Sequence, residues 1–221
     1  MGRDIAFETP SGSIGGWRAD PVEAPRGALV VVQEIFGVNA HLRSVVDHYA
    51  AEGYVALAPA YFDPIERGVE LDYGRDGVAR GKALVDELGF DRAVAITAAA
   101  AKLLCSEGLK VGVVGFCWGG TIALLGNVRL GLPAVSYYGA RNLPFLDEPL
   151  RAPMQFHFGE HDRSIPPQAV AAHRAKLPAA EVWTYPAGHA FNRDSDPAVY
   201  DAASARSAHA RAMELFAGAL G

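Results

Sequence analysis

The sequence predicts an α/β fold with a mostly parallel central sheet and helices on both faces. Apolar runs rich in β-branched residues, such as Ala28–Val32, are typical of strands that are buried on both faces of a parallel sheet. Segments with helical spacing alternate with these runs, which indicates βαβ units. The 221 residues are enough to bury a large core, so a single domain spanning residues 1–221 is expected.

Charge and composition exclude several classes of partner. The chain has 20 Lys and Arg against 25 Asp and Glu, a formal net charge of −5, and no basic run. This balance argues against nucleic acid and against an anionic membrane surface as main partners. No apolar run is long enough to span a bilayer, and no early segment has the features of a secretory signal. Because Cys105 and Cys117 are the only cysteines, no disulfide framework is expected, and the cytoplasm is the expected compartment.

The N-terminal half is expected to begin with a hairpin at one edge of the sheet. Ile5–Thr9 alternates in polarity, Pro10-Ser11-Gly12 interrupts it, and Ile14–Trp17 returns antiparallel to it. The same half is predicted to hold strands at 28–32 and 54–58 and helices at 39–53 (beginning at Asn39 or His41), 78–88 and 90–105. Residues 61–77 are polar and form a connection that could lie over a site.

The C-terminal half is predicted to alternate strands and helices in the same way. Strands are expected from Val111, at 134–138, at 154–158 and at 181–185, and helices after Gly120, from Pro166 or Pro167 to Lys176, and at 197–219. A sheet of this kind places its ligand crevice beyond the carboxyl ends of the strands. We therefore expect the catalytic and ligand-binding residues in the segments that follow these strands.

The segment Gly115-Phe116-Cys117-Trp118-Gly119-Gly120 joins a predicted central strand to a helix. This pattern is typical of a nucleophile elbow, a strained turn that exposes its middle side chain at the top of the sheet. Glycines flank the turn because a Cβ there would collide with neighbouring backbone. The helix N-terminus would favour a thiolate at Cys117, and the N–H of Trp118 could hold an oxyanion. The alternative is a buried structural cysteine that packs as a small hydrophobe.

A second motif, Gln33-Glu34-Ile35-Phe36-Gly37, follows the strand at 28–32. Glu34 would lie at the carboxyl end of that strand, where ligand crevices form. The N–H of Ile35 stands where a second oxyanion donor is expected. The alternative is that Glu34 is a solvated loop acid, as most glutamates are.

Two further strands are followed by an acid and a histidine. Gly159-Glu160-His161-Asp162 comes after the strand at 154–158, and His189 lies in a glycine-containing loop after the strand at 181–185. Cys117, Asp162 and His189 then follow the chain order nucleophile, acid, histidine. Glu160 is a rival for the acid.

These motifs together resemble the dienelactone hydrolase family (carboxymethylenebutenolidases) of the α/β-hydrolase fold. The resemblance rests on the elbow, on the segments that contain Glu34, Asp162 and His189, and on Tyr137-Tyr138-Gly139, and it covers the chain nearly end to end. It implies that Cys117 is the nucleophile, His189 the base, Asp162 the orienting acid and Glu34 a partner of the thiol. Trp118 and Ile35 would supply the oxyanion N–H groups.

The resemblance also implies substrate contacts. Family members bind the carboxylate of dienelactone with two arginines, and Arg193 stands at one of these places, four residues beyond His189. At the other place, near Tyr61, this chain has Asp63, and an acidic side chain would repel a carboxylate. Tyr138 is a further expected substrate contact. The alternative for Arg193 is a plain surface charge.

The expected activity is therefore hydrolysis of a small lactone or ester through an acyl-thioester enzyme. No metal or other cofactor is expected, and the resemblance suggests a monomer. The alternatives are hydrolysis of a different ester or thioester, a non-catalytic binding protein with this fold, and a redox role for the Cys117 thiolate.

Overall fold

The computed structural model describes residues 2–221, and the chain separates into two compact units. The first extends to Gly112 and includes Leu220–Gly221; the second is Val113–Ala219. The first unit contains β1 (Arg3–Thr9), β2 (Gly12–Ala19), β3 (Ala28–Val32), α1 (Ala40–Ala51), β4 (Val55–Pro59) and α2 (Arg75–Ser106).

The strands of the first unit lie in the order β1-β2-β4-β3. Strands β1 and β2 form the predicted antiparallel hairpin, which turns at Gly12 with a φ of 96°. Strand β2 is antiparallel to β4, and β3 is parallel to β4 with Leu29 opposite Ala56. Every residue of β3 and β4 is buried, as the apolar runs predict for strands covered on both faces.

The helices of the first unit follow the sequence signals closely. The side chain of Asn39 caps α1 by accepting a hydrogen bond from the Leu42 N–H at 3.1 Å. Helix α2 is divided at Gly89, whose φ of 70° no helix accommodates, so the two predicted helices are confirmed. The first of them begins at Arg75, three residues before the predicted start at Val78.

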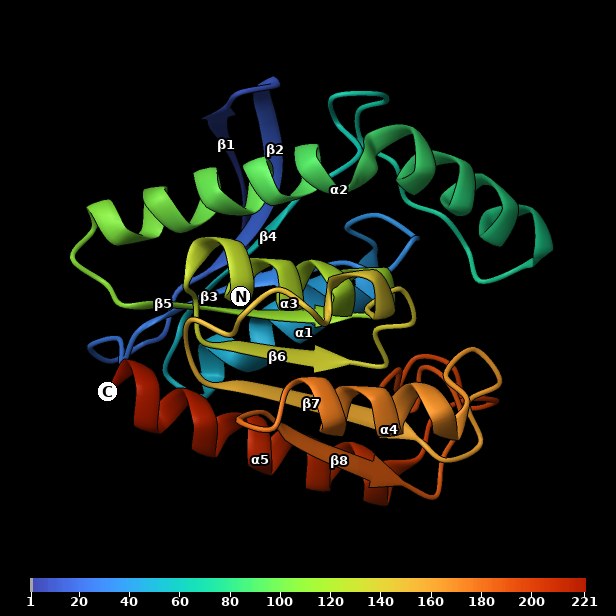
Figure 1. Cartoon of the computed structure of the whole chain (residues 1–221). Coiled ribbons are helices and arrows are strands. Elements are labelled where there is room, and N and C mark those ends of the chain that lie inside the picture. Colours follow the sequence, from blue (N-terminus) through green and yellow to red (C-terminus); the bar gives the residue numbers. More distant parts are fainter. Residues whose placement is uncertain (1) are drawn as a thin grey trace. The chain divides into compact units, whose positions relative to one another are not determined.

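The second unit is built from four parallel strands in the order β5-β6-β7-β8 (Figure 1). Its elements are β5 (Val111–Phe116, from the end of the first unit), α3 (Trp118–Leu130), β6 (Ala134–Tyr137), the short 3-10 helix η1 (Leu143–Phe145), β7 (Met154–Gly159), α4 (Pro167–Lys176), β8 (Glu181–Tyr185) and α5 (Ala202–Leu220). Each predicted strand is present, and η1 is an addition.

Helices α4 and α5 cover opposite faces of strand β7. His173 of α4 packs edge-on against the rings of Phe156 and Phe158, both at 4.8 Å. On the other face, His157 bonds the hydroxyl of Tyr185, which in turn accepts a hydrogen bond from Arg211 of α5. Because successive side chains of a strand point to opposite faces, the second unit has helices on both sides of its sheet, as the fold class requires.

The predicted start of the last helix at Pro197 is wrong. Helix α5 begins at Ala202, because the backbone carbonyl of Asp196 accepts hydrogen bonds from Val199 and Tyr200 and closes a separate turn there. The carboxylate of Asp201 then accepts a hydrogen bond from the Ser204 N–H at 2.8 Å, which is the geometry of an N-cap. A capping acid therefore decides the helix start, and proline does not.

Candidate active site

Cys117 lies at the junction of β5 and α3 in a conformation that few non-glycine residues adopt. Its φ is 55° and its ψ is −117°, and its side chain is partly exposed. The Cys117 N–H donates to the Tyr137 carbonyl at 3.0 Å, and its own carbonyl accepts from the Gly120 N–H at 3.0 Å. These bonds hold the turn, and Trp118 is the first residue of the helix.

The glycines of the elbow are required by close backbone contacts. A Cβ at Gly115 would lie 1.8 Å from the Gly119 carbonyl oxygen, and one at Gly120 would lie 2.7 Å from the Tyr137 carbonyl oxygen. Neither neighbour is a flexible side chain, so any larger residue would push strand and helix apart. The sequence pattern G-x-C-x-G-G therefore has a steric cause.

The loops after β7 and β8 bring Asp162 and His189 together. The Nδ1 of His189 lies 2.6 Å from Oδ2 of Asp162, whose side chain is fully buried while that of His189 is 29% exposed. Oδ1 of Asp162 accepts the Ser164 N–H at 2.8 Å. The rival acid, Glu160, is exposed. Of the two acids, Asp162 is thus the partner of this imidazole.

His189 also interacts with Cys117, and the two partners together set its charge. Burial, the largest influence, opposes protonation of His189. Hydrogen bonds to Asp162 and Cys117 and the charges of both outweigh it, so the pKa of His189 rises from 6.5 to about 10. Because Nδ1 faces Asp162, the nitrogen that faces the sulfur is Nε2. The arrangement favours an imidazolium between two groups that can be anionic.

Backbone strain is concentrated at this place. Within residues 2–221, the non-glycine residues with positive φ are Cys117, Tyr138 at 41° and Ala190 at 61°. Ala190 follows His189, and the Tyr138 ring lies 5.0 Å from the imidazole of His189. Strained residues of this kind persist where surrounding structure holds them, commonly at functional sites. No feature of the sequence predicts a positive φ at Tyr138 or Ala190.

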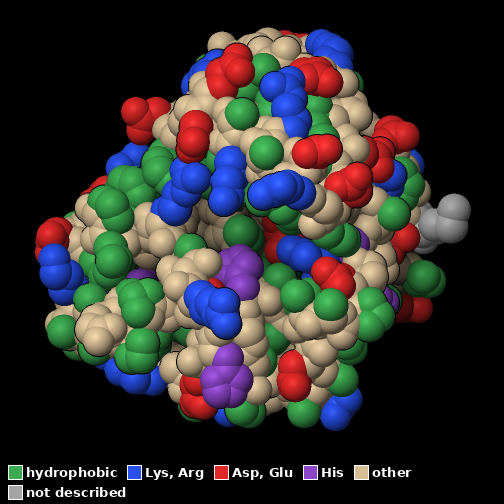
Figure 2. Space-filling view, turned by 90° about the vertical axis from the view of Figure 1, so that its right-hand side faces the viewer, with side chains coloured by type: hydrophobic (Ala, Val, Ile, Leu, Met, Phe, Trp, Pro, Cys, Tyr) green, Lys and Arg blue, Asp and Glu red, His purple; other side chains and the backbone are tan. Residues whose placement is uncertain are grey.

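The two predicted substrate contacts are both largely enclosed. Tyr138 is 1% exposed and packs between His189 and Phe191, the latter at 5.4 Å in an edge-on arrangement. Arg193 is 7% exposed, and its Nη1 lies 3.3 Å from Oδ2 of Asp196. Arg193 is therefore a buried, partly neutralised cation and not a plain surface charge. Histidine side chains are visible, among basic and acidic ones, on the face toward which β6, β7 and β8 point (Figures 1 and 2).

The Gln33–Gly37 motif follows β3 in the first unit. Glu34 and Ile35 are 7% and 8% exposed, so Glu34 is a buried acid and not a solvated one. A Cβ at Gly81 of α2 would lie 2.1 Å from the Ile35 carbonyl oxygen, which shows how closely that helix presses on the motif. Gly37 is needed as well, because it has a φ of 78° and lies against the Val69 carbonyl.

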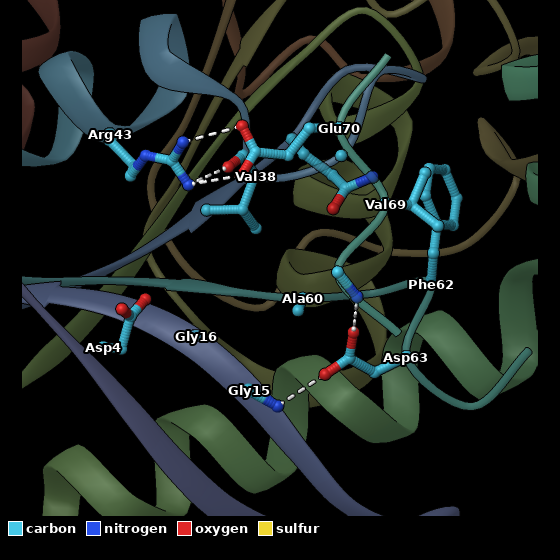
Figure 3. A pocket seen from close by; sticks show the side chains of 13 residues that line it. Asp4, Gly15, Gly16, Val38, Arg43, Ala60, Phe62, Asp63, Val69 and Glu70 are labelled. Atoms are coloured by element: carbon cyan, nitrogen blue, oxygen red, sulfur yellow. Dashed lines mark hydrogen bonds and ion pairs between the residues drawn. The ribbon is translucent and has the colours of Figure 1, made fainter. Parts of the chain in front are cut away.

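Asp63, which stands where the resemblance leads us to expect an arginine, has a structural role. Its two carboxylate oxygens accept the backbone N–H groups of Gly15 at 2.7 Å and Gly68 at 3.2 Å (Figure 3). The bond from Gly15 ties the loop after β4 to strand β2, and the bond from Gly68 lies within that loop. The same loop is held by a two-pronged pair between Arg43 and Glu70. Asp63 and its neighbours line a small cavity of about 150 Å³ within this unit.

The α/β fold, the elbow cysteine and the acid–histidine pair define the α/β-hydrolase class. The sequence model of the dienelactone hydrolase family matches residues 14–220, and the chain belongs to this family. It is accordingly a hydrolase that acts on esters or lactones.

Known proteins similar to this chain support that assignment. The carboxymethylenebutenolidase of Pseudomonas putida is 32% identical, covering 93% of this chain and 91% of that protein. A protein of Synechocystis sp. that bears the same name provisionally is 34% identical, covering 92% and 91%. The crystal structure of a provisionally named dienelactone hydrolase from Klebsiella pneumoniae has 29% identity and a TM-score of 0.85, with 98% of both chains covered.

The described residues contain neither a candidate membrane-spanning helix nor a candidate metal-binding group. Residues 2–221 hold no helix that is both long enough and apolar enough to cross a membrane. Over the same residues, no group of three or more His, Cys, Asp or Glu side chains is arranged to hold a metal ion.

Proposed function

We propose that this protein hydrolyses a small lactone or ester with Cys117 as nucleophile, His189 as general acid and base, and Asp162 as the acid that orients His189. The observation that carries the proposal is the chain of contacts from the buried Asp162 carboxylate through His189 to the sulfur at the elbow. An activated nucleophile consists of a carboxylate, an imidazole and a thiol that are hydrogen-bonded in this order.

The proposed reaction has two halves. The Cys117 thiolate attacks the carbonyl carbon, and the oxyanion is held by the backbone N–H groups of Trp118 and Ile35. Collapse breaks the bond to the leaving oxygen, which takes the proton from His189 and leaves an acyl-thioester. Water then attacks the thioester while His189 accepts its proton, and the acid product and the thiolate are released.

In a lactone the leaving oxygen stays tethered to the acyl group, so it can take part in the second half. Glu34, a buried acid in the first motif, is proposed as a partner of the thiol when Cys117 is not engaged with substrate. We propose Tyr138 as a wall of the substrate site, because its ring packs on the His189 imidazole.

Trapping of the acyl-thioester tests this mechanism. The protein is incubated briefly with p-nitrophenyl acetate, quenched in acid, digested and analysed by mass spectrometry. We expect one acetyl group on the peptide that contains Cys117 and none on the peptide that contains Cys105, which is exposed. An acetyl group on Cys105 alone, or turnover with no acylated cysteine under any quench time, would reject the covalent route.

Arg193 is proposed to bind a substrate carboxylate. The Arg193 guanidinium is buried and lies 3.3 Å from Asp196, and the planar fork of an arginine suits a carboxylate. We expect Arg193→Met to raise KM for an ester that bears a carboxylate by about tenfold, which corresponds to loss of a charge-assisted hydrogen bond.

A matched neutral ester of the same size is the control for Arg193→Met, and its KM should change less than about threefold, since a neutral group gains little from the cation. Equal changes for the two esters would show that Arg193 supports the fold and does not select substrate.

A further inference from the structure

The loops that carry Asp162 and His189 are tied together by strand β8. The backbone carbonyl of Tyr185, its last residue, accepts the N–H groups of Glu160 at 2.8 Å and Ala187 at 2.7 Å. The Ala187 carbonyl then accepts the His161 N–H at 3.0 Å. A shift at the end of β8 would therefore move the acid and the histidine together or pull them apart.

The hydroxyl of Tyr185 is held by hydrogen bonds to residues of β7 and α5. It lies 2.8 Å from Nδ1 of His157 on β7 and 2.8 Å from Nη1 of Arg211 on α5. Arg211 can only donate, so the hydroxyl accepts from Arg211, and it forms a second hydrogen bond with His157. His157 is 0% exposed, and burial, followed by the charge of Arg211, lowers its pKa to about 3. His157 is thus neutral throughout the ordinary pH range.

His157 and Tyr185 also support the loop after β6, which carries Tyr138. The His157 carbonyl accepts the N–H of Tyr138 at 2.8 Å, and Tyr138 is the strained residue whose ring packs on His189. The Tyr185 ring contacts Phe191, two residues beyond His189, at 5.2 Å. The loops after β6, β7 and β8 therefore all depend on His157 and Tyr185.

We propose that the hydrogen-bonded chain Arg211–Tyr185–His157 positions the Asp162–His189 pair against Cys117, and that Tyr185 is its central positioning residue. Tyr185 touches neither the sulfur nor the carbonyl of a substrate in this role. It acts through the backbone of the two loops. The proposal rests on the proposed function of Cys117 and His189, but its test measures the sulfur without any ester.

Alkylation of Cys117 by iodoacetamide as a function of pH is that test, carried out in a Cys105→Ser background so that Cys117 is the only thiol. The charged or titratable groups that face His189 are Asp162, Cys117 and Tyr138, and those that face His157 are Tyr185, Tyr137 and Arg211. A displaced His189 stabilises the thiolate less. We therefore expect Tyr185→Phe to move the alkylation profile to higher pH by about one unit.

Tyr61→Phe is the matched control. It also removes a buried tyrosine hydroxyl, which forms a hydrogen bond with Thr97 at 2.7 Å, but in the first unit. Its alkylation profile should coincide with that of the parent. A Tyr185→Phe protein that keeps its near-ultraviolet circular dichroism and has an unshifted profile would overturn the proposal.

A second variant decides the matter should Tyr185→Phe fail to fold. Arg211→Met removes the donor to the hydroxyl and leaves Tyr185 and His157 in place. A shift of the Cys117 alkylation profile to higher pH, smaller than the one expected for Tyr185→Phe, supports the proposal. An alkylation profile that coincides with that of the parent rejects it. Failure of the proposed function would look different, because the parent itself would then show no rapid alkylation near neutral pH and no ester turnover.

Discussion

Hydrolysis of p-nitrophenyl acetate is expected to fall by about 10⁴-fold or more in kcat/KM when Cys117 is replaced by Ala. The variant keeps the backbone donors proposed for the oxyanion, so a small residual rate should remain, but no side chain replaces the sulfur at the elbow. Release of p-nitrophenolate measures the effect directly. Because Ala has a Cβ as Cys does, we expect the variant to keep the φ of 55° at this position, so the loss should come from the missing sulfur and not from the elbow.

Cys105→Ala is the control for this change. Cys105 is exposed on α2, and its replacement should leave kcat/KM within about twofold, as surface substitutions usually do. Cys117→Ser tests the chemistry further, because a hydroxyl at the same place is less easily deprotonated than a thiol. Activity of Cys117→Ala within tenfold of the parent would exclude a cysteine nucleophile.

Asp162→Asn is expected to lower kcat by about 10⁴-fold, the effect of losing the orienting carboxylate of a triad. The Asp162 side chain is fully buried, and its Oδ2 lies 2.6 Å from His189 Nδ1. An amide at this place no longer selects the tautomer or stabilises the imidazolium. Steady-state kinetics with the same ester measure the loss, and folding is checked by thermal unfolding.

The pH dependence of Asp162→Asn provides a second readout. In the parent the pKa of His189 is raised from 6.5 to about 10. The protonated imidazole of His189 therefore stabilises the fold fully below about pH 6.5, and this contribution is lost as the pH rises toward 10. Without the carboxylate the imidazolium should lose its proton at lower pH, which NMR of the His189 ring can follow. The control is Glu160→Gln, which removes an exposed carboxylate from the same loop and should change neither property.

Much of the fold could be predicted because its signals are local. The buried runs of β3 and β4, the Asn39 cap and the glycine that divides α2 each act through neighbouring residues. The start of α5 was mispredicted for a related reason. Prolines suit the first turn of a helix, but the competing turn at Asp196 depends on contacts that sequence pattern does not specify.

The candidate site was predictable only as a set of positions. Each predicted side chain stands just beyond a strand, and Cys117, Asp162 and His189 do meet in the second unit. Asp63 shows where the pattern was insufficient, since the sequence predicts only a missing arginine, whereas the structure has a carboxylate that ties a loop to β2.

By itself the sequence determined the class of fold, the sharp turn at the elbow and the family. The reason is that hydrophobic periodicity and the steric requirement for glycine both depend on residues that are close together in the chain. Only the tertiary structure decided that Asp162, and not Glu160, bonds His189, and that Tyr185 joins the two loops. The physical reason is separation along the chain. Asp162 and His189 are 27 residues apart and His157 and Tyr185 are 28 apart, so strand pairing and burial must bring them within hydrogen-bonding distance.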